Sequence, residues 1–385
     1  CPRRYDGVKY AIKWGKMTMA HDDTHCCESH SHSLSRRSAL LMGAAAGLAG
    51  SVGISDAATA PAAAPAPAAT PGGGKVIDVH HHCFPPIMRK QKRKELLETS
   101  SRPDVVEWQP EWSIEDMDKG GVATTILSCV GPGVWDGNVA NSRLMARDYN
   151  DYSAMLVKAH PGRFGFFAGI PLPDTDGTLR EIEYGLDKLH ADGVCLHTSY
   201  DDKYLGDAKF QPVYAELNKR KAVVYVHPNS PSCCAKLVPE LPQAFIEFPF
   251  ASTRAIASLL YTGTLSRYPD IQWIFSHGGG TTPFLANRMS NWAGEPEMKK
   301  RIPEGPAACL ARLNFDTASI TNANAWAAIT SFTTTKKIMF GTDFPWGKSA
   351  PYLGQLAKLA KTPQELADVQ YATARRIIPS QKSKT

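Results

Sequence analysis

Short apolar runs alternate with helix-like segments from residue 75 almost to the end of the chain. Eight runs have the composition of buried strands, at 75–80, 122–130, 163–170, 193–198, 222–227, 271–277, 311–316 and 336–342. Between most of them, apolar residues recur at helical spacing, at 139–159, 177–190, 211–220, 252–266, 282–291, 322–331 and 363–377. Alternating strands and helices predict a parallel sheet, and eight such units are the number in a (β/α)8 barrel. The expected fold class is therefore α/β, with TIM-barrel architecture.

Two long connections interrupt this alternation. The first, 83–121, holds Trp108 and Trp112, and the second, 228–251, is rich in Pro, Phe and Cys. Long loops in a compact fold commonly carry function. We therefore expect both connections to overhang the mouth of the barrel.

The first 74 residues lack the strand–helix alternation. Arg36 and Arg37 precede a short Gly- and Ala-rich apolar run at 39–54, which is typical of a twin-arginine (Tat) export signal. A chance Arg pair before an Ala-rich linker is the alternative, and the run is too short for a membrane span. We expect export to the periplasm or beyond, with no membrane attachment in the mature form. The predicted organisation is a signal-bearing extension at 1–58, an Ala/Pro/Gly linker at 59–74, the barrel at 75–378 and a polar tail at 379–385.

Composition and charge narrow the range of partners. The 385 residues carry a formal charge of +6, and over most of the domain after the linker Lys and Arg are mixed with Asp and Glu. This balance does not predict nucleic-acid binding, so the expected partner is a small molecule. The nine cysteines form no framework of regular spacings, and buried free thiols are expected where they fall in apolar runs.

Four of the apolar runs stand out because a histidine or an aspartate lies at or directly after their carboxyl end. The first ends in His80 and His82, and later runs end in His227, His277 and Asp343. Alternate residues on a strand share a face, and the carboxyl ends of barrel strands meet at one mouth. A His-rich surface loop or hydrogen-bonded core histidines are the alternatives. Burying so many polar strand ends without partners would cost several kcal/mol, and a bound metal would remove that cost.

The predicted metal ligands are His80, His82, His227 and Asp343. Three imidazoles and one carboxylate suit a single divalent ion, with zinc favoured and manganese, cobalt or iron as alternatives. His277 then remains near the metal as a general acid or base. The residue between the two first histidines, His81, should point the other way.

These segments together resemble the amidohydrolase superfamily, in the amidohydrolase-related branch that includes aminocarboxymuconate semialdehyde decarboxylase. The matching pieces are 78–82, 226–228, 275–280 and 341–345. Three further segments are similar in sequence to 6-methylsalicylate decarboxylase-like proteins, at 112–122, 163–168 and 247–254. The resemblance implies that the four predicted ligands occupy the family's metal positions and that His277 is the catalytic histidine.

The resemblance also implies a homodimer. Arg288, eleven residues after His277, matches an arginine that in the semialdehyde decarboxylases reaches the substrate carboxylate of a neighbouring subunit. Those enzymes carry a further substrate-binding arginine in the first long loop, where this chain has residues 107–112, Glu-Trp-Gln-Pro-Glu-Trp. This departure favours a flatter, more aromatic substrate over a dicarboxylate.

The expected activity is non-oxidative decarboxylation of a hydroxylated aromatic or related unsaturated carboxylic acid. The metal would hold a substrate oxygen and absorb developing charge, while Asp343 or His277 moves the proton that replaces carbon dioxide. Aromatic side chains that could wall the pocket, with core packing as the alternative, are Trp108, Trp112, Phe344 and Trp346. Hydrolysis of a lactone, amide or ester would use the same ligands, and a non-catalytic metal-binding protein is a third possibility. Release of carbon dioxide distinguishes the first activity from the second.

Overall fold

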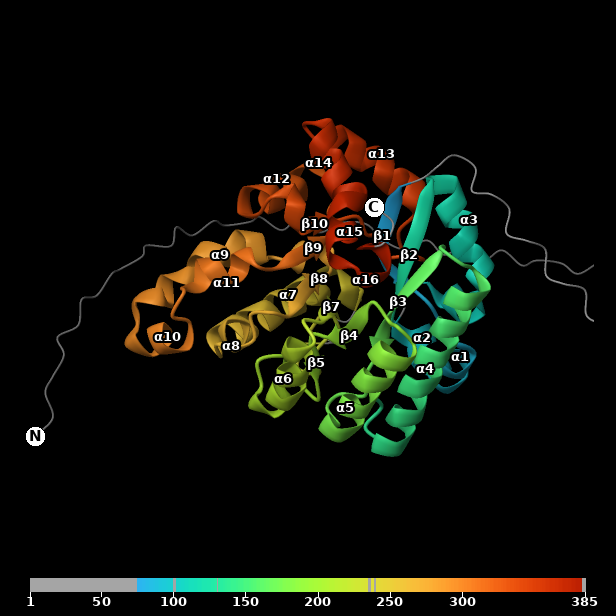
Figure 1. Ribbon diagram of the computed structural model, residues 1–385, viewed down its shortest axis with the longest axis horizontal. Helices are drawn as coiled ribbons and strands as arrows, with labels where there is room; N and C mark the ends of the chain where they lie inside the picture. The colour runs from blue at the N-terminus through green and yellow to red at the C-terminus, as the bar shows by residue number, and fades with distance from the viewer. Residues whose placement is uncertain (1–74, 100–101, 130, 235–236, 239, 383–385) are drawn as a thin grey trace, which may run out of the picture. The chain divides into compact units, whose positions relative to one another are not determined.

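The computed structural model describes residues 75–99, 102–129, 131–234, 237–238 and 240–382. Its centre is an eight-stranded parallel sheet with the strands near the middle of Figure 1 and the helices around them. In sheet order the strands are β1 (Val76–His82), β2 (Val122–Ser128), β3 (Phe164–Gly169), β4 (Gly193–His197), β7 (Val223–His227), β8 (Gln272–Phe275), β9 (Asn314–Asp316) and β10 (Ile338–Met339). The predicted (β/α)8 barrel with eight parallel strands is confirmed.

The sheet closes on itself between the first strand and the segment that follows β10. The backbone N–H of Val79 donates to the carbonyl of Phe340 at 2.9 Å, and that of His82 donates to the carbonyl of Phe344 at 3.0 Å. The carboxyl end of β1 therefore lies beside residues 340–344. Closure brings together two ends of the domain that are more than 250 residues apart in the chain.

Some strands of this barrel are apolar over most of their length because both of their faces are buried. All six residues of β3 and all five of β7 are buried. Inside the barrel, the rings of Phe167 and Tyr225 stack at 5.0 Å. Packed rings fill the interior below the mouth, as expected of a barrel whose centre is a core and not a pore.

Helices follow the strands in the expected order. Several begin at a capping side chain: Asn138, Asn322 and Thr362 each accept a hydrogen bond from the backbone N–H three residues later, which satisfies a free helical donor. The helices after β2 to β10 are α4 (Val139–Ala159), α5 (Thr175–Glu183) with the π-helical turn η2 (Tyr184–Lys188), α6 (Gln211–Lys219), α7 (Gln243–Tyr261), α8 (Thr264–Arg267), α9 (Thr282–Ser290), α10 (Pro296–Arg301), α11 (Pro306–Ala311), α12 (Ala323–Phe332), α13 (Ser349–Leu359), α14 (Pro363–Ala367), η7 (Asp368–Ala372) and α15 (Thr373–Ile377). Of these, α9, α10 and α11 extend to the left of the barrel in Figure 1.

Both long connections contain more helix than the sequence analysis expected. The first holds α1 (Pro86–Gln91), α2 (Arg93–Thr99), the 3-10 helix η1 (Pro103–Glu107) and α3 (Pro110–Gly120). In the second, α7 begins at Gln243 and not near residue 252. Pro249 lies inside α7, and a proline in that position favours a loop when only the local sequence is considered. The loop after β7 is therefore shorter than predicted.

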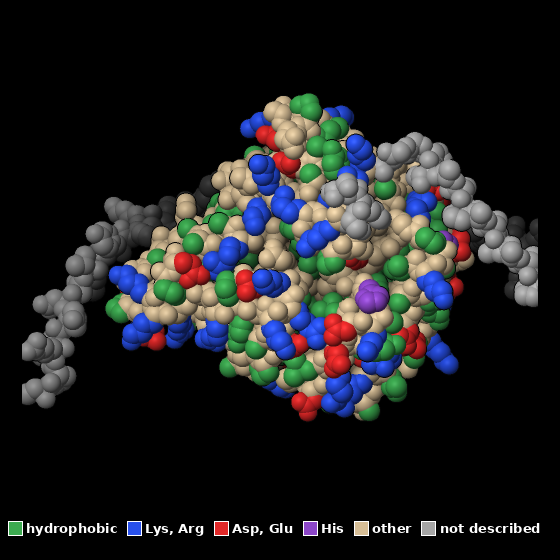
Figure 2. All heavy atoms as spheres, in the orientation of Figure 1, with side chains coloured by type: hydrophobic (Ala, Val, Ile, Leu, Met, Phe, Trp, Pro, Cys, Tyr) green, Lys and Arg blue, Asp and Glu red, His purple; other side chains and the backbone are tan. Residues whose placement is uncertain are grey.

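The first residues of the predicted polar tail form α16 (Pro379–Lys382), in which Gln381 is buried and the backbone N–H of Ser380 donates to Asp192 at 2.7 Å. The export signal and linker predicted at 1–74 lie outside the described residues. Among the helices that the structure describes, none is both long and apolar enough to span a bilayer. On the face drawn in Figure 2, Lys and Arg are interspersed with Asp and Glu.

Candidate metal centre

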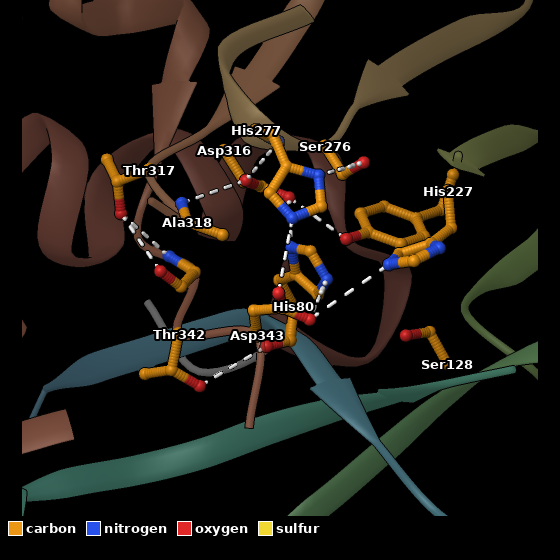
Figure 3. A network of polar contacts seen from close by, with 12 residues as sticks. His80, Ser128, His227, Ser276, His277, Asp316, Thr317, Ala318, Thr342 and Asp343 are labelled. Carbon is orange, nitrogen blue, oxygen red and sulfur yellow. Dashed lines mark hydrogen bonds and ion pairs between the residues drawn. The ribbon is translucent and has the colours of Figure 1, made fainter. Parts of the chain in front are cut away.

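The four predicted ligands meet at the mouth of the barrel, and Figure 3 labels three of them, His80, His227 and Asp343. Nε2 of His80 lies 3.1 Å from Nε2 of His82 and 3.1 Å from Oδ1 of Asp343. The same carboxylate oxygen lies 2.9 Å from Nε2 of His82 and 4.0 Å from Nε2 of His227. All four ligating atoms fall within 4.8 Å of one another. The structure thus brings the whole predicted set to one point.

The outer nitrogen of each ligand histidine faces a hydrogen-bond acceptor. Nδ1 of His80 lies 2.9 Å from Oδ2 of Asp316, and Nδ1 of His82 lies 3.1 Å from the hydroxyl of Ser128. Nδ1 of His227 lies 2.9 Å from the carbonyl oxygen of Pro228. A neutral imidazole that donates from Nδ1 keeps the lone pair on Nε2 for a metal. These partners therefore direct three lone pairs toward the same point.

The geometry of this cluster fits one divalent cation. Among the described atoms, Nε2 of His227 is buried and has no hydrogen-bond partner, a loss of about 1–3 kcal/mol if nothing else satisfies it. Ligands about 2.1 Å from a tetrahedral ion lie roughly 3.4 Å from each other, close to the separations between His80, His82 and Asp343. A cation at the centre would satisfy the free nitrogen and the converging lone pairs together.

Asp343 reaches this point because its backbone is held in a left-handed turn. Its φ is 60°, a conformation that costs an L-residue about 1–3 kcal/mol. Its own N–H donates to the carbonyl of His80 at 2.8 Å, and its carbonyl accepts from the N–H of Trp346 at 2.8 Å. The neighbouring Thr342 donates from its backbone N–H, at 3.1 Å, and from its hydroxyl, at 2.6 Å, to the buried carboxylate of Asp78. The turn after β10 is thereby fastened to β1.

Burial and neighbouring charges together set the pKa of each group in the centre. Burial lowers the pKa of His80, but Asp316 and Asp343 outweigh it and raise that pKa to about 10 when no metal is bound. Burial lowers the pKa of His82 and takes that of His227 well below its usual value. Burial raises the pKa of Asp343, yet His80 and the other histidines hold it well below its usual range. The metal-free centre thus carries one imidazolium, on His80, between two carboxylates.

Asp316 is a site residue that the sequence analysis missed. It lies at the end of β9 and is fully buried. Its Oδ1 accepts from the backbone N–H groups of His277, at 2.9 Å, and Ala318, at 3.0 Å, and its Oδ2 accepts from the hydroxyl of Tyr225 at 2.9 Å. The seventh apolar run ends in this residue, so the strand-end rule that found the ligands could have found it.

His277 lies beside the ligands and outside the ligand set. Its Nε2 is 3.2 Å from Oδ2 of Asp343, and its Nδ1 is 3.1 Å from the hydroxyl of Ser276. The side chain of His277 is 11% exposed, whereas those of the three ligand histidines are 0–2% exposed. The imidazole of His277 is thus more exposed than those of the ligand histidines, and it lies beside the ligand Asp343, whose side chain is 16% exposed. Its predicted role in proton transfer stays a prediction.

Two of the predicted wall residues lie behind the mouth. The ring of Phe344 stacks on His81 at 4.4 Å, and His81, as predicted, points away from the ligands toward Asp78 and Ser113. Trp108 is fully buried and donates from its indole N–H to Ser113 at 3.3 Å. Neither ring has an open face toward the metal point, so contact with a substrate would require movement.

Three other predicted substrate contacts have different environments. Trp346 is half-buried, and its ring lies 5.6 Å from that of His82, at the edge of the metal point. Trp112 is half-buried against the core. Arg288 is exposed on α9. The structure therefore brings only Trp346 next to the ligands, and the substrate contacts of all three remain predictions.

Two further side chains border the ligands without having been predicted. His197 ends β4, and its ring centroid lies 6.4 Å from that of His227. Burial lowers the pKa of His197 to about 4, so its ring is neutral. Phe248, in the first half of α7, lies 5.9 Å from His227 on another side. His197 carries the same signal as the ligands, a histidine ending an apolar run, whereas Phe248 was assigned to a loop.

Comparisons with known proteins agree with this geometry. A family model described as Amidohydrolase matches residues 77–379. A decarboxylase from Penicillium terrestre is 33% identical over 323 residues, which cover 79% of this chain and 94% of the relative. A 6-methylsalicylic acid decarboxylase from Penicillium expansum is 37% identical over 281 residues, covering 70% of this chain and 84% of the relative.

Solved structures share the same fold. A 5-carboxyvanillate decarboxylase from Sphingomonas paucimobilis aligns with a TM-score of 0.74 at 19% identity, covering 79% of this chain and 98% of that one. Identity at this level supports the fold alone. The family match, in contrast, spans the whole barrel and includes every residue of the metal centre. The chain therefore belongs to the amidohydrolase family.

Proposed function

We propose that this protein is a metal-dependent decarboxylase that removes carbon dioxide, without oxidation, from a hydroxylated aromatic carboxylic acid. The observation that carries the proposal is a ligand set of three buried histidines and Asp343 with a further imidazole, that of His277, 3.2 Å from Asp343. The relatives named above support this choice, because one of them is a 6-methylsalicylic acid decarboxylase. Hydrolysis is the less favoured alternative, since the relatives are decarboxylases.

The cofactor that we infer is one divalent cation held by His80, His82, His227 and Asp343. Once bound, it supplies positive charge that holds a substrate oxygen and absorbs the charge that develops as carbon dioxide leaves. The donor set suits zinc. Manganese is the alternative, and it is bound in the structures of a 5-carboxyvanillate decarboxylase from Novosphingobium aromaticivorans and a dihydroxybenzoic acid decarboxylase from Polaromonas.

Side chains around the metal site transfer the proton, orient the proton donor and limit access of water. As the bond between the ring carbon and the carboxylate breaks, a proton from Nε2 of His277 is transferred to that carbon. Before this transfer, Oδ2 of Asp343 accepts the same N–H at 3.2 Å and orients the imidazole, while the hydroxyl of Ser276 holds the ring from Nδ1. Phe248 and Trp346 flank the ligands and would limit access of water. Positioned proton donors of this kind contribute roughly 10²–10⁴-fold to rate.

The proposal is tested by offering the purified protein, loaded with zinc or with manganese, a panel of aromatic hydroxy acids and aromatic lactones. The expected result is one carbon dioxide released for each acid consumed, together with the ring compound lacking its carboxylate. A protein that opens lactones and releases no carbon dioxide from any acid would overturn the proposal. The protein without metal is the matched control, because both activities need the cation.

A further inference from the structure

The end of β4 places at the mouth of the barrel a histidine, His197, that has no part in the metal site or in the proposed proton transfer. His197 is paired in register with His227 on the adjacent parallel strand. Residues opposite one another in neighbouring strands project from the same face of a sheet. Because the side chain of His227 points to the metal centre, that of His197 points to the same mouth, one strand further along.

No described residue forms a hydrogen bond with Nε2 of this ring. His197 is 8% exposed, and its Nε2 is buried with no hydrogen-bond partner among the described residues. It is not a member of the ligand set, since it falls outside the group of atoms within 4.8 Å of one another. A buried polar nitrogen without a partner is unfavourable, and barrels place their functional side chains at this end of the strands.

The ring of His197 is also held in place. Its backbone N–H donates to the hydroxyl of Tyr200 at 2.9 Å. In the loop after β2, Gly133 lies against the ring, and a Cβ added there would come within 2.7 Å of Cε1. Only a glycine fits this close approach at a φ of 72°. A fixed ring with a free nitrogen at the mouth has the features of a prepared hydrogen-bonding position.

We propose that His197 is a specificity-determining residue whose Nε2 forms a hydrogen bond with a ring hydroxyl of the aromatic acid. This inference rests on the proposed function, because it takes the substrate to be an aromatic acid anchored at the metal centre. Nε2 of His227 faces that centre and the ring of His197 is 6.4 Å from the ring of His227. An aromatic acid held at the cation by one oxygen can therefore present a hydroxyl on its benzene ring to His197. An acid that lacks this hydroxyl would leave the nitrogen unpaired and would be rejected.

The test compares the wild-type protein with H197F and H197N. The matched control is H160F, the same change at a half-buried histidine at the end of α4, outside the mouth. For each, kcat/KM is measured for benzoic acids with and without ring hydroxyls, together with metal content and thermal stability. The wild-type protein should prefer a hydroxylated acid. H197F should lower kcat/KM for that acid roughly 10- to 100-fold while leaving the acid without the hydroxyl almost unaffected, so that the ratio collapses.

The other readouts separate this role from structural ones. H197F should retain its metal and be at least as stable as the wild-type protein, because an apolar ring removes an unpaired buried nitrogen. H197N, which keeps a polar group, should recover part of the preference. An unchanged ratio between the two acids, or loss of metal in H197F, would overturn the inference.

Calorimetry with 2-hydroxybenzoate and benzoate as binding probes keeps this inference distinct from the proposed function. If no acid in the panel releases carbon dioxide, the proposed function fails, yet the affinities still test His197. The metal-loaded wild-type protein should bind the hydroxylated member of a pair more tightly, and H197F should bind both members equally. Equal affinities in the wild-type protein across mono- and dihydroxybenzoates would remove the hydroxyl-binding role.

Discussion

Replacing Asp316 by asparagine should weaken metal binding in a way that depends on pH. The carboxylate of Asp316 faces Nδ1 of His80 at 2.9 Å and accepts from Tyr225 and from the backbone of His277. Asparagine keeps the size of the side chain and an acceptor for the backbone donors, but it removes the negative charge. Loss of such a partner to a metal-bound histidine lowers metal affinity roughly 10- to 100-fold.

Protonation of His80 determines how much of the loss in metal affinity is measured at a given pH. Its pKa is raised to about 10 in the metal-free protein, so below that pH the imidazole is protonated and a binding metal must displace the proton. The logarithm of the apparent affinity of the wild-type protein should therefore rise by about one per pH unit between pH 6 and 9. In D316N one of the two charges that raise this pKa is gone, so the pKa falls and the slope flattens. The two curves should converge at low pH and separate at high pH.

The assay is metal titration by calorimetry at several pH values, in buffers of different ionisation enthalpy that report the number of protons released. The control is D368N, a change at another buried aspartate, which accepts a hydrogen bond from Thr335 at 2.8 Å away from the metal centre. Both variants should lose about 1–3 kcal/mol of unfolding free energy in the metal-free form, measured by urea denaturation. Only D316N should alter the pH slope. Parallel curves for D316N and the wild-type protein, or a flat wild-type curve, would refute the reasoning.

Three other expectations concern His277, Arg288 and the amino-terminal arginines. H277A should keep its metal and lower turnover roughly 10²–10⁴-fold, measured by metal analysis beside carbon dioxide release; normal turnover with full metal occupancy would exclude the acid–base role. R288A should raise the KM for the acid, and sedimentation of the wild-type protein should give a dimer, because this exposed side chain is predicted to serve a neighbouring subunit; an unchanged KM would leave Arg288 without that role. Replacing Arg36 and Arg37 with lysine should keep the protein in the cytoplasm of a bacterial host, followed by cell fractionation, since a twin-arginine signal requires both; unchanged export would count against that route.

The sequence by itself determined the barrel and the polar residues that end its strands, because both follow from local patterns. Strands buried on both faces are continuous apolar runs, so all eight could be counted. In a barrel, a histidine or aspartate at the carboxyl end of such a run lies at the mouth, where the strand ends meet. That rule brings His80, His82, His227 and Asp343 to one mouth.

The tertiary structure decided which strand-end residues are ligands and which support them. Asp316 and His197 end apolar runs as the ligands do, yet one is hydrogen-bonded behind His80 and the other stands beside His227. Helix α7 also continues through Pro249 toward the mouth, bringing Phe248 near His227. These outcomes depend on distances between segments that are far apart in the chain. Local propensity and periodicity carry no information about such distances, which closure and packing of the barrel set.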